Sequence, residues 1–162
     1  MKQTKFISIF LFILLIFEGC SYFKLLTFKI PEIKNIKKVV YKKIEISKAQ
    51  LIFTVEVNNK NDFDLNIISS DYEVYLEGKY LGKGTTEKRQ VILKNSINEL
   101  EFPLTVNLLD AFRNGLSVLS IISGSENLLY HTKGNAMVSF EGIDRQFEVP
   151  LDIENRAKIY SE

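Results

Sequence analysis

Apolar and polar residues alternate with a period of two along much of the chain after residue 35. This period is typical of a β-strand with one face buried and the other face in water. It predicts strands that begin near residue 36 and that cover residues 51–57, 72–77, 99–108 and 147–153. The predicted inward faces consist of Ile36, Val40, Ile44 and Ile46; Leu51, Phe53, Val55 and Val57; Tyr72, Val74 and Leu76; Leu100, Phe102, Leu104, Val106 and Leu108; and Phe147, Val149, Leu151 and Ile153.

Residues that favour turns separate these strands. Gly82 and Gly84 are predicted to interrupt the strand that returns from a tight hairpin, because glycine weakens a strand interior. The hairpin itself is predicted from a short Gly-containing segment between two alternating runs. The predicted reversals lie at residues 58–62, 77–79, 95–96 and 141–144.

Two prolines limit where their strands can lie in a sheet. Pro103 and Pro150 both fall on outward positions of predicted strands. Proline has no N–H to donate, so we expect both at a sheet edge or an irregularity. Short strands at this spacing predict a mainly β fold, an antiparallel β-sandwich.

One segment departs from the period of two and indicates a single α-helix. Apolar residues recur at steps of four, four, three and three, which places them on one helical face. We expect a helix over residues 108–122, packed on the sandwich and ending at Ser123-Gly124. A membrane-active helix is the alternative, but the opposite face carries no cationic array. The apolar face consists of Leu108, Phe112, Leu116, Leu119 and Ile122, and the opposite face offers Asp110, Arg113, Asn114 and Ser117.

The first nineteen residues have the pattern of an export signal. Lys2 and Lys5 precede an apolar run at residues 6–17 that only Ser8 interrupts. A twelve-residue helix spans roughly 18 Å, whereas the hydrocarbon core of a bilayer is about 30 Å thick. A basic region followed by an apolar region of this length is typical of a signal peptide.

The signal ends in Phe17-Glu18-Gly19-Cys20, which resembles the lipobox of bacterial lipoproteins. Phe17 stands where leucine is usual, and Glu18 stands where a small or apolar residue is usual. The resemblance implies cleavage before Cys20 and acylation of this cysteine, with palmitate-like chains as the membrane anchor. We therefore expect a lipoprotein signal peptide (residues 1–19), a lysine-rich tether (20–34) and a β-sandwich domain (35–162), at the periplasmic or outer-surface side of a bacterial envelope membrane.

Three other interpretations of Cys20 remain open at this point. Cleavage by the ordinary signal peptidase would leave a free thiol, and an uncleaved segment would act as an interfacial anchor. A catalytic cysteine is disfavoured, because the sole histidine, His131, lies in no recognisable partner motif. Residues 20–48 carry eight Lys against two Glu, which suits an anionic membrane surface but equally suits the solvated face of a strand.

Composition argues against several function classes. The net charge is +1 and only four of the 21 basic residues are Arg, so we expect no nucleic-acid partner. Asp62, Asp64, Asn66 and Glu73 match the spacing of calcium-loop ligands, but Ile67 occupies the position that needs Gly. Alternation along a strand explains the same spacing, so we predict no metal, no cofactor and no catalytic residues.

Residues 49–84, AQLIFTVEVNNKNDFDLNIISSDYEVYLEGKYLGKG, are similar to the WHy (water stress and hypersensitive response) domain of the late embryogenesis abundant type. Residues 99–108 and 133–142 continue the similarity, which covers residues 36–153, and Lys60 stands where the family has proline. The resemblance implies an immunoglobulin- or fibronectin-III-like topology, no catalytic residues and an association with desiccation and stress tolerance. The matching turn and hairpin positions are Asn59, Asn61, Phe63, Tyr72, Gly78, Gly82 and Gly84.

The sequence therefore predicts a non-enzymatic, lipid-anchored envelope protein that contacts an unidentified envelope protein or glycan. One rival is a surface binding module of the adhesin type, for which Tyr75 and Tyr80 are the outward aromatic candidates. A second rival is a lipid-handling domain, which requires an apolar groove between the sheet and the helix at residues 108–122.

Overall fold

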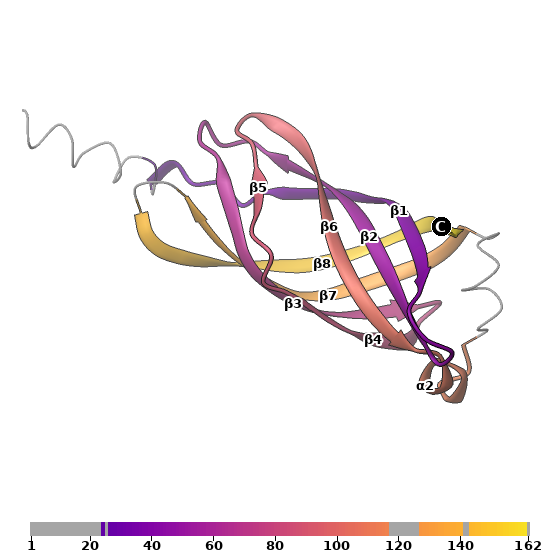
Figure 1. The fold of residues 1–162 in the computed structure, drawn as a ribbon. Helices are drawn as coiled ribbons and strands as arrows, with labels where there is room; N and C mark the ends of the chain where they lie inside the picture. Colours follow the sequence, from indigo (N-terminus) through magenta and orange to yellow (C-terminus); the bar gives the residue numbers. More distant parts are fainter. Residues whose placement is uncertain (1–23, 25, 117–126, 141–142, 162) are drawn as a thin grey trace, which may run out of the picture.

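The computed structural model describes residues 24, 26–116, 127–140 and 143–161. The elements whose bounds the structure gives are eight strands and one short helix, so the predicted mainly β fold is confirmed (Figure 1). The elements are β1 (Glu32–Lys43), β2 (Lys48–Asn59), β3 (Leu65–Leu76), β4 (Lys79–Thr86), β5 (Gln90–Ile92), β6 (Ser96–Asn107), α2 (Leu108–Arg113), β7 (Asn127–Phe140) and β8 (Ile143–Ser161).

The strands form one sheet that curls into two facing layers, in the order β4-β3-β7-β8-β1-β2-β6, with β5 also paired to β3. All pairings are antiparallel except that of β1 with β8, which join in parallel over three residues each, 39–41 and 159–161. The two outer edges of the sheet meet at β5 and β6. There the side chain of Gln90 donates to the Glu101 carbonyl at 2.9 Å and accepts from the Glu101 N–H at 2.8 Å. The antiparallel sandwich is therefore confirmed, as a sheet curled on itself.

The inward faces of β2, β3 and β6 are those that the alternation predicts, and they form the core between the layers. Strand β1 is different. Register shifts between Ile33 and Asn35 and between Ile36 and Lys38 change which residues point inward. Ile36, Val39 and Tyr41 are buried, whereas Ile44 and Ile46 lie exposed after the strand, so the face predicted for β1 was wrong beyond Ile36.

Strand β4 includes both Gly82 and Gly84, so the predicted break is wrong, although its register with β3 shifts by one residue between Tyr80 and Gly82. Gly84 instead allows the Tyr72 ring to lie close against the backbone of β4. It and Gly134 are the register partners of Tyr72 on either side. A Cβ at Gly84 would lie 2.3 Å from Cε2 of Tyr72. The space beside the glycine thus admits the Tyr72 ring, whose hydroxyl donates to the Pro103 carbonyl in the opposite layer.

Both prolines lie at unpaired edges, as predicted. Pro103 is in β6, which ends the strand order. Pro150 pairs with Asn135 of β7, in a stretch of β8 that has no pairing to β1. The predicted hairpin is also confirmed: Glu77 and Gly78 form a two-residue turn with positive φ values of 49° and 76°.

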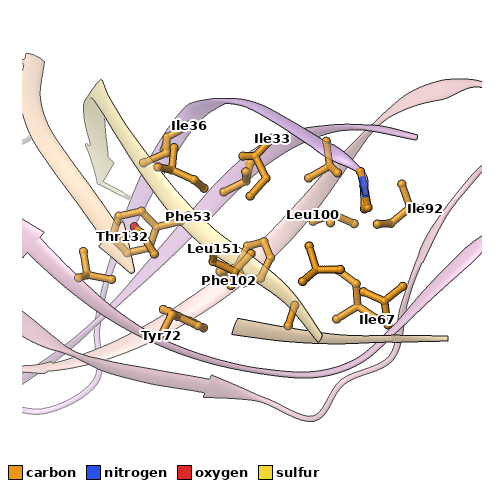
Figure 2. A pocket seen from close by; sticks show the side chains of 18 residues that line it. Ile33, Ile36, Phe53, Ile67, Tyr72, Ile92, Leu100, Phe102, Thr132 and Leu151 are labelled. Carbon is orange, nitrogen blue, oxygen red and sulfur yellow. The ribbon is translucent and has the colours of Figure 1, made fainter. Parts of the chain in front are cut away.

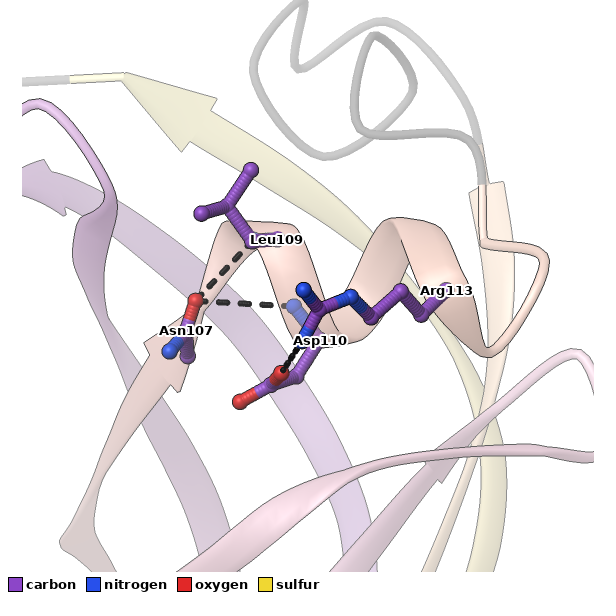
Figure 3. Close-up of polar contacts among 4 residues, drawn as sticks. All are labelled: Asn107, Leu109, Asp110 and Arg113. Carbon is purple, nitrogen blue, oxygen red and sulfur yellow. Dashed lines mark hydrogen bonds and ion pairs between the residues drawn. The ribbon is translucent and has the colours of Figure 1, made fainter.

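The helix is shorter than predicted. Its N-cap, Asn107, accepts from the N–H groups of Leu109 and Asp110 at 3.0 and 3.5 Å (Figure 3). The helix ends at Arg113 because Gly115 adopts a φ of 74°, a left-handed conformation that stops helices.

The predicted apolar face of the helix is also partly wrong. Ala111 and Leu116 are buried, but Phe112 is 69% exposed. Residues 117–122, which the prediction placed in the same helix, lie outside the described residues.

Candidate functional site

The predicted lipid-attachment residue, Cys20, and the predicted signal peptide lie outside the described residues. The chain that leads from them into the sandwich is described from Leu26 onward. Residues 28–31 of this segment, here called the lead-in, lie within the range that the sequence assigns to the tether. Their contacts decide how an anchored N-terminus would hold the domain.

The side chain of Asn61 binds the backbone of the lead-in at Lys29. Its side-chain oxygen accepts from the Lys29 N–H at 2.7 Å, and its side-chain nitrogen donates to the Lys29 carbonyl at 2.8 Å. Next to this pair, the Phe28 ring stacks on Phe140 and Phe147, with centroids 5.7 and 5.2 Å apart. The lead-in is therefore packed on the domain before β1 begins.

Asn59 supports Asn61 from inside the fold. It is fully buried, and its side-chain oxygen accepts from the backbone N–H and the side-chain amide of Asn61, at 3.0 and 2.8 Å. Its side-chain nitrogen donates to the carbonyls of Phe63 and Ile92, at 3.0 and 3.1 Å. The asparagine-rich turn thus joins β2, β5 and the lead-in in one hydrogen-bond network.

An ion pair ties the first residue of β1 to the same turn. The Glu32 carboxylate lies 2.8 Å from Nζ of Lys60 and 2.9 Å from Nζ of Lys34. Hydrogen bonds from Lys60 and then Lys34 lower the pKa of Glu32 to about 2. Lys60, at the position where the WHy pattern has proline, therefore reinforces the contact between β1 and the turn.

An apolar cavity lies between the two layers (Figure 2). The cavity has a volume of about 30 Å³ and is partly open to solvent. One water needs roughly 10–15 Å³ on this measure, so the cavity is narrow. It is lined by Pro31, Ile33, Ile36, Phe53, Val55, Val57, Ile67, Tyr72, Val74, Ile92, Leu100, Phe102, Thr132, Ala136, Val138, Val149, Leu151 and Ile153.

The position of this cavity differs from the groove predicted for a lipid-handling domain. Helix α2 contributes no lining residue, so the space does not lie between sheet and helix. It lies instead beside the region where β1 and β8 diverge, because these strands pair only at residues 39–41 and 159–161. Ile33 and Ile153, one from each strand, are half-buried there. Sequence periodicity could not reveal this space, because it depends on how the two layers fit.

The outward aromatic residues form a row across the outer face of the layer that contains β3, β4 and β7. Tyr75 pairs with Tyr80 on one side and with His131 on the other. The Tyr75 ring centroid lies 5.7 Å from that of Tyr80 and 6.2 Å from that of His131. His131 Nε2 lies 2.8 Å from Oδ1 of Asp152. Tyr80 is 40% exposed and Tyr75 is half-buried, so the row is accessible from solvent.

The residues with calcium-loop spacing do not converge on one point. Oδ1 of Asp64 accepts from the Lys94 N–H at 2.8 Å, and Oε2 of Glu73 accepts from the Tyr75 hydroxyl at 2.9 Å. Among the described residues, no group of three or more His, Cys, Asp or Glu side chains is placed to hold a metal ion. In the same part of the chain, no helix has the length and apolar character that crossing a membrane requires.

The fold and its buried asparagine turn define a small β domain, and comparison with known proteins assigns its family. The family model described as late embryogenesis abundant protein (LEA_2) matches residues 54–155. The chain belongs to this family, whose members are stress-related β domains and generally non-enzymatic. The comparison with curated proteins gives no significant match.

Solved structures share the fold at low sequence identity. A solution structure of an Arabidopsis thaliana protein has a TM-score of 0.55 and 14% identity, over 83% of this chain and 85% of that chain. A crystal structure of a protein from Archaeoglobus fulgidus has a TM-score of 0.50 and 12% identity, over 80% of this chain and 100% of that chain. At these identities the likeness concerns the fold alone.

Proposed function

We propose that this chain is a WHy-type member of the family that is held at the bacterial cell envelope by acylation of Cys20. It acts without catalysis, through contacts with an envelope protein or glycan under water stress. The observation that carries the proposal is the docked lead-in. Phe28 follows Cys20 by eight residues, a reach of roughly 28 Å at most. An acylated Cys20 therefore holds the sandwich close to the lipid headgroups.

Charge along the first strand fits this position. Residues 20–48 carry eight Lys and two Glu, and Lys34, Lys37 and Lys38 are exposed on β1. Each basic residue close to an anionic leaflet contributes about 1 kcal/mol of attraction. Lys34 and Lys37 pair with Glu32 and Glu99, so the attraction comes from the excess of six basic residues over residues 20–48 as a whole, which favours a domain that rests near an anionic membrane surface.

Metabolic labelling tests the anchor. Cells that express the full chain are grown with an alkyne analogue of palmitate. The wild-type chain is expected to take up the label, and Cys20→Ser is expected to lose it. Cys20 is the sole cysteine, so no other thiol can be labelled. Ser21→Ala is the matched control and should label as the wild type does. Labelling of Cys20→Ser at the wild-type level contradicts the anchor.

The intersheet cavity supports a second candidate, the binding of a hydrocarbon chain between the layers. Its lining is apolar and includes residues of β1 and β8 from the stretch where these strands are not paired with each other. A ligand of more than a few atoms needs the layers to move apart, and this unpaired region permits such a movement without breaking the ladder.

The aromatic row of Tyr75, Tyr80 and His131 leaves the surface binding module as the remaining alternative.

A fluorescent fatty acid titrated against the full chain tests the second candidate. Saturable binding is expected for the wild type, with at least a tenfold loss of affinity in Ile153→Lys, which puts a charge at a half-buried position of the lining. Ile97→Lys, an exposed apolar position outside the lining, should bind as the wild type does. Equal affinity in all three chains rejects the cavity as the binding site.

A further inference from the structure

Pro31, the last residue of the lead-in, forms part of the wall of the apolar cavity. It is buried, and it lines the cavity together with Ile33 and Ile36 of β1. Figure 2 shows Ile33 and Ile36 on the side of the cavity opposite to Ile67 and Tyr72. The cavity therefore becomes wider and more open if the lead-in moves away and takes Pro31 with it.

The asparagine-rich turn between β2 and β3 holds the chain on both sides of Pro31. Two residues before Pro31, the N–H and the carbonyl of Lys29 are bonded to the Asn61 side chain, at 2.7 and 2.8 Å. One residue after Pro31, the Glu32 carboxylate lies 2.8 Å from Nζ of Lys60. The place of Pro31 at the cavity thus depends on two adjacent residues of one turn.

The lead-in can leave this position without disturbing the sheet. The ladder of β1 with β2 begins at Glu32, so residues 28–31 lie outside it. Within these residues, Lys29 and Ile30 are exposed and Phe28 is half-buried. Segments with many exposed residues and no ladder bonds open locally before the domain unfolds. Opening of the lead-in therefore needs only local changes, with the start of β1 as the hinge.

We propose that the lead-in is a lid that controls access to the intersheet cavity. In the closed position Asn61 holds the backbone of Lys29, and Pro31 covers part of the space between the layers. In the open position these hydrogen bonds are broken, Pro31 is withdrawn, and solvent or an apolar ligand reaches the cavity. The role of a ligand rests on the second candidate function, the binding of a hydrocarbon chain, whereas the movement of the lid does not. The same segment leads to Cys20, so the proposed anchor and the cavity are coupled through it.

Thiol labelling measures access to the cavity without any ligand. Cys20→Ser removes the sole cysteine from the full chain. Ala136→Cys then places one thiol in the lining, where the native side chain is buried. The rate of its reaction with methyl methanethiosulfonate, a small reagent, reports how often the thiol is accessible. Ala111→Cys, a buried position of α2 outside the lining, reports opening of the whole domain, and the exposed Thr85→Cys gives the rate of an accessible thiol.

Two substitutions at one position of the lead-in provide a matched comparison. Lys29→Pro removes the N–H that donates to Asn61, whereas Lys29→Ala keeps both backbone hydrogen bonds. Lys29→Pro is expected to label Ala136→Cys at least ten times faster than Lys29→Ala does, with no change at Ala111→Cys. Phe28→Ala, which removes the ring that stacks on Phe140 and Phe147, should accelerate the labelling in the same way.

Three results overturn the lid. The first is an equal labelling rate of Ala136→Cys in Lys29→Pro and Lys29→Ala. The second is an equal acceleration at Ala111→Cys, because the whole domain then opens. The third is labelling of Ala136→Cys as fast as that of Thr85→Cys with the lead-in unchanged, because the cavity is then open already.

Titration of the fluorescent fatty acid against the same chains separates the lid from the second candidate function. Tighter binding to Lys29→Pro than to Lys29→Ala supports both inferences. Accelerated labelling in Lys29→Pro without fatty-acid binding to any chain supports the lid and rejects the cavity as a hydrocarbon site. Binding with equal affinity and equal labelling rates in both chains rejects the lid and leaves the hydrocarbon site standing.

Discussion

Replacement of Asn59 by alanine is expected to lower the free energy of unfolding by about 3–5 kcal/mol. The Asn59 side chain makes four hydrogen bonds in a fully buried position. Its removal leaves the carbonyls of Phe63 and Ile92 and the side chain of Asn61 without these partners, and each buried polar group left unsatisfied costs about 1–3 kcal/mol. Urea unfolding of the purified chain, followed by far-ultraviolet circular dichroism, measures the change.

Two further variants sharpen this test. Asn58→Ala, at the adjacent half-buried position, should cost less than about 1 kcal/mol, as most substitutions at less buried positions do. Asn59→Asp keeps an acceptor for Asn61 but loses the donor to Phe63 and Ile92 and buries a charge, so it should be about as damaging as alanine. A loss in Asn59→Ala no larger than that in Asn58→Ala contradicts the structural role of the turn.

Replacement of Gly134 by alanine is expected to destabilise the fold by about 3 kcal/mol, or to prevent folding altogether. A Cβ at this position would lie 2.1 Å from the Asp71 carbonyl oxygen and 2.6 Å from Cα of Tyr72. Both are backbone atoms in the β3–β7 ladder, so the two strands would have to separate. The same unfolding measurement applies, with soluble yield as the readout if the variant does not fold.

Gly82→Ala is the matched control for this prediction. The Cβ there would meet Cδ1 of Leu104 at 3.3 Å, which is the end of a side chain and can move by a few tenths of an ångström. A cost of about 1 kcal/mol or less is expected. If Gly82→Ala proves as damaging as Gly134→Ala, the backbone contact is not the cause.

The sequence predicted the inward faces of β2, β3 and β6 because alternation is a local property of a strand. It failed for β1 because a register shift between Ile36 and Lys38, which depends on pairing with β2, moves the inward positions from Val40 to Val39 and Tyr41. It extended the helix too far because apolar spacing outweighed Asn114-Gly115, a stop signal that the sequence does contain.

The candidate site was predictable only in outline. The resemblance to the WHy domain marked Asn59, Asn61 and Phe63, but it did not show that Asn61 binds the backbone of Lys29, 32 residues earlier in the chain. The exposure of Phe112 was missed because its spacing assigned it to the core. Both features depend on which segments meet in three dimensions, and a pattern along the chain does not encode that directly.

The two hydrogen bonds between Asn61 and Lys29 also determine how the domain bears mechanical force. Both hydrogen bonds use the backbone of Lys29, so any residue with an N–H can stand at that position. A pull on the chain ahead of Phe28 first loads these two bonds and the stacked rings. Beyond them, force along the axis of β1 shears its ladder with β2, in which ten residue pairs share the load together. A pull on the N-terminus along this axis is therefore resisted by the whole β1–β2 ladder at once, rather than by one residue pair after another.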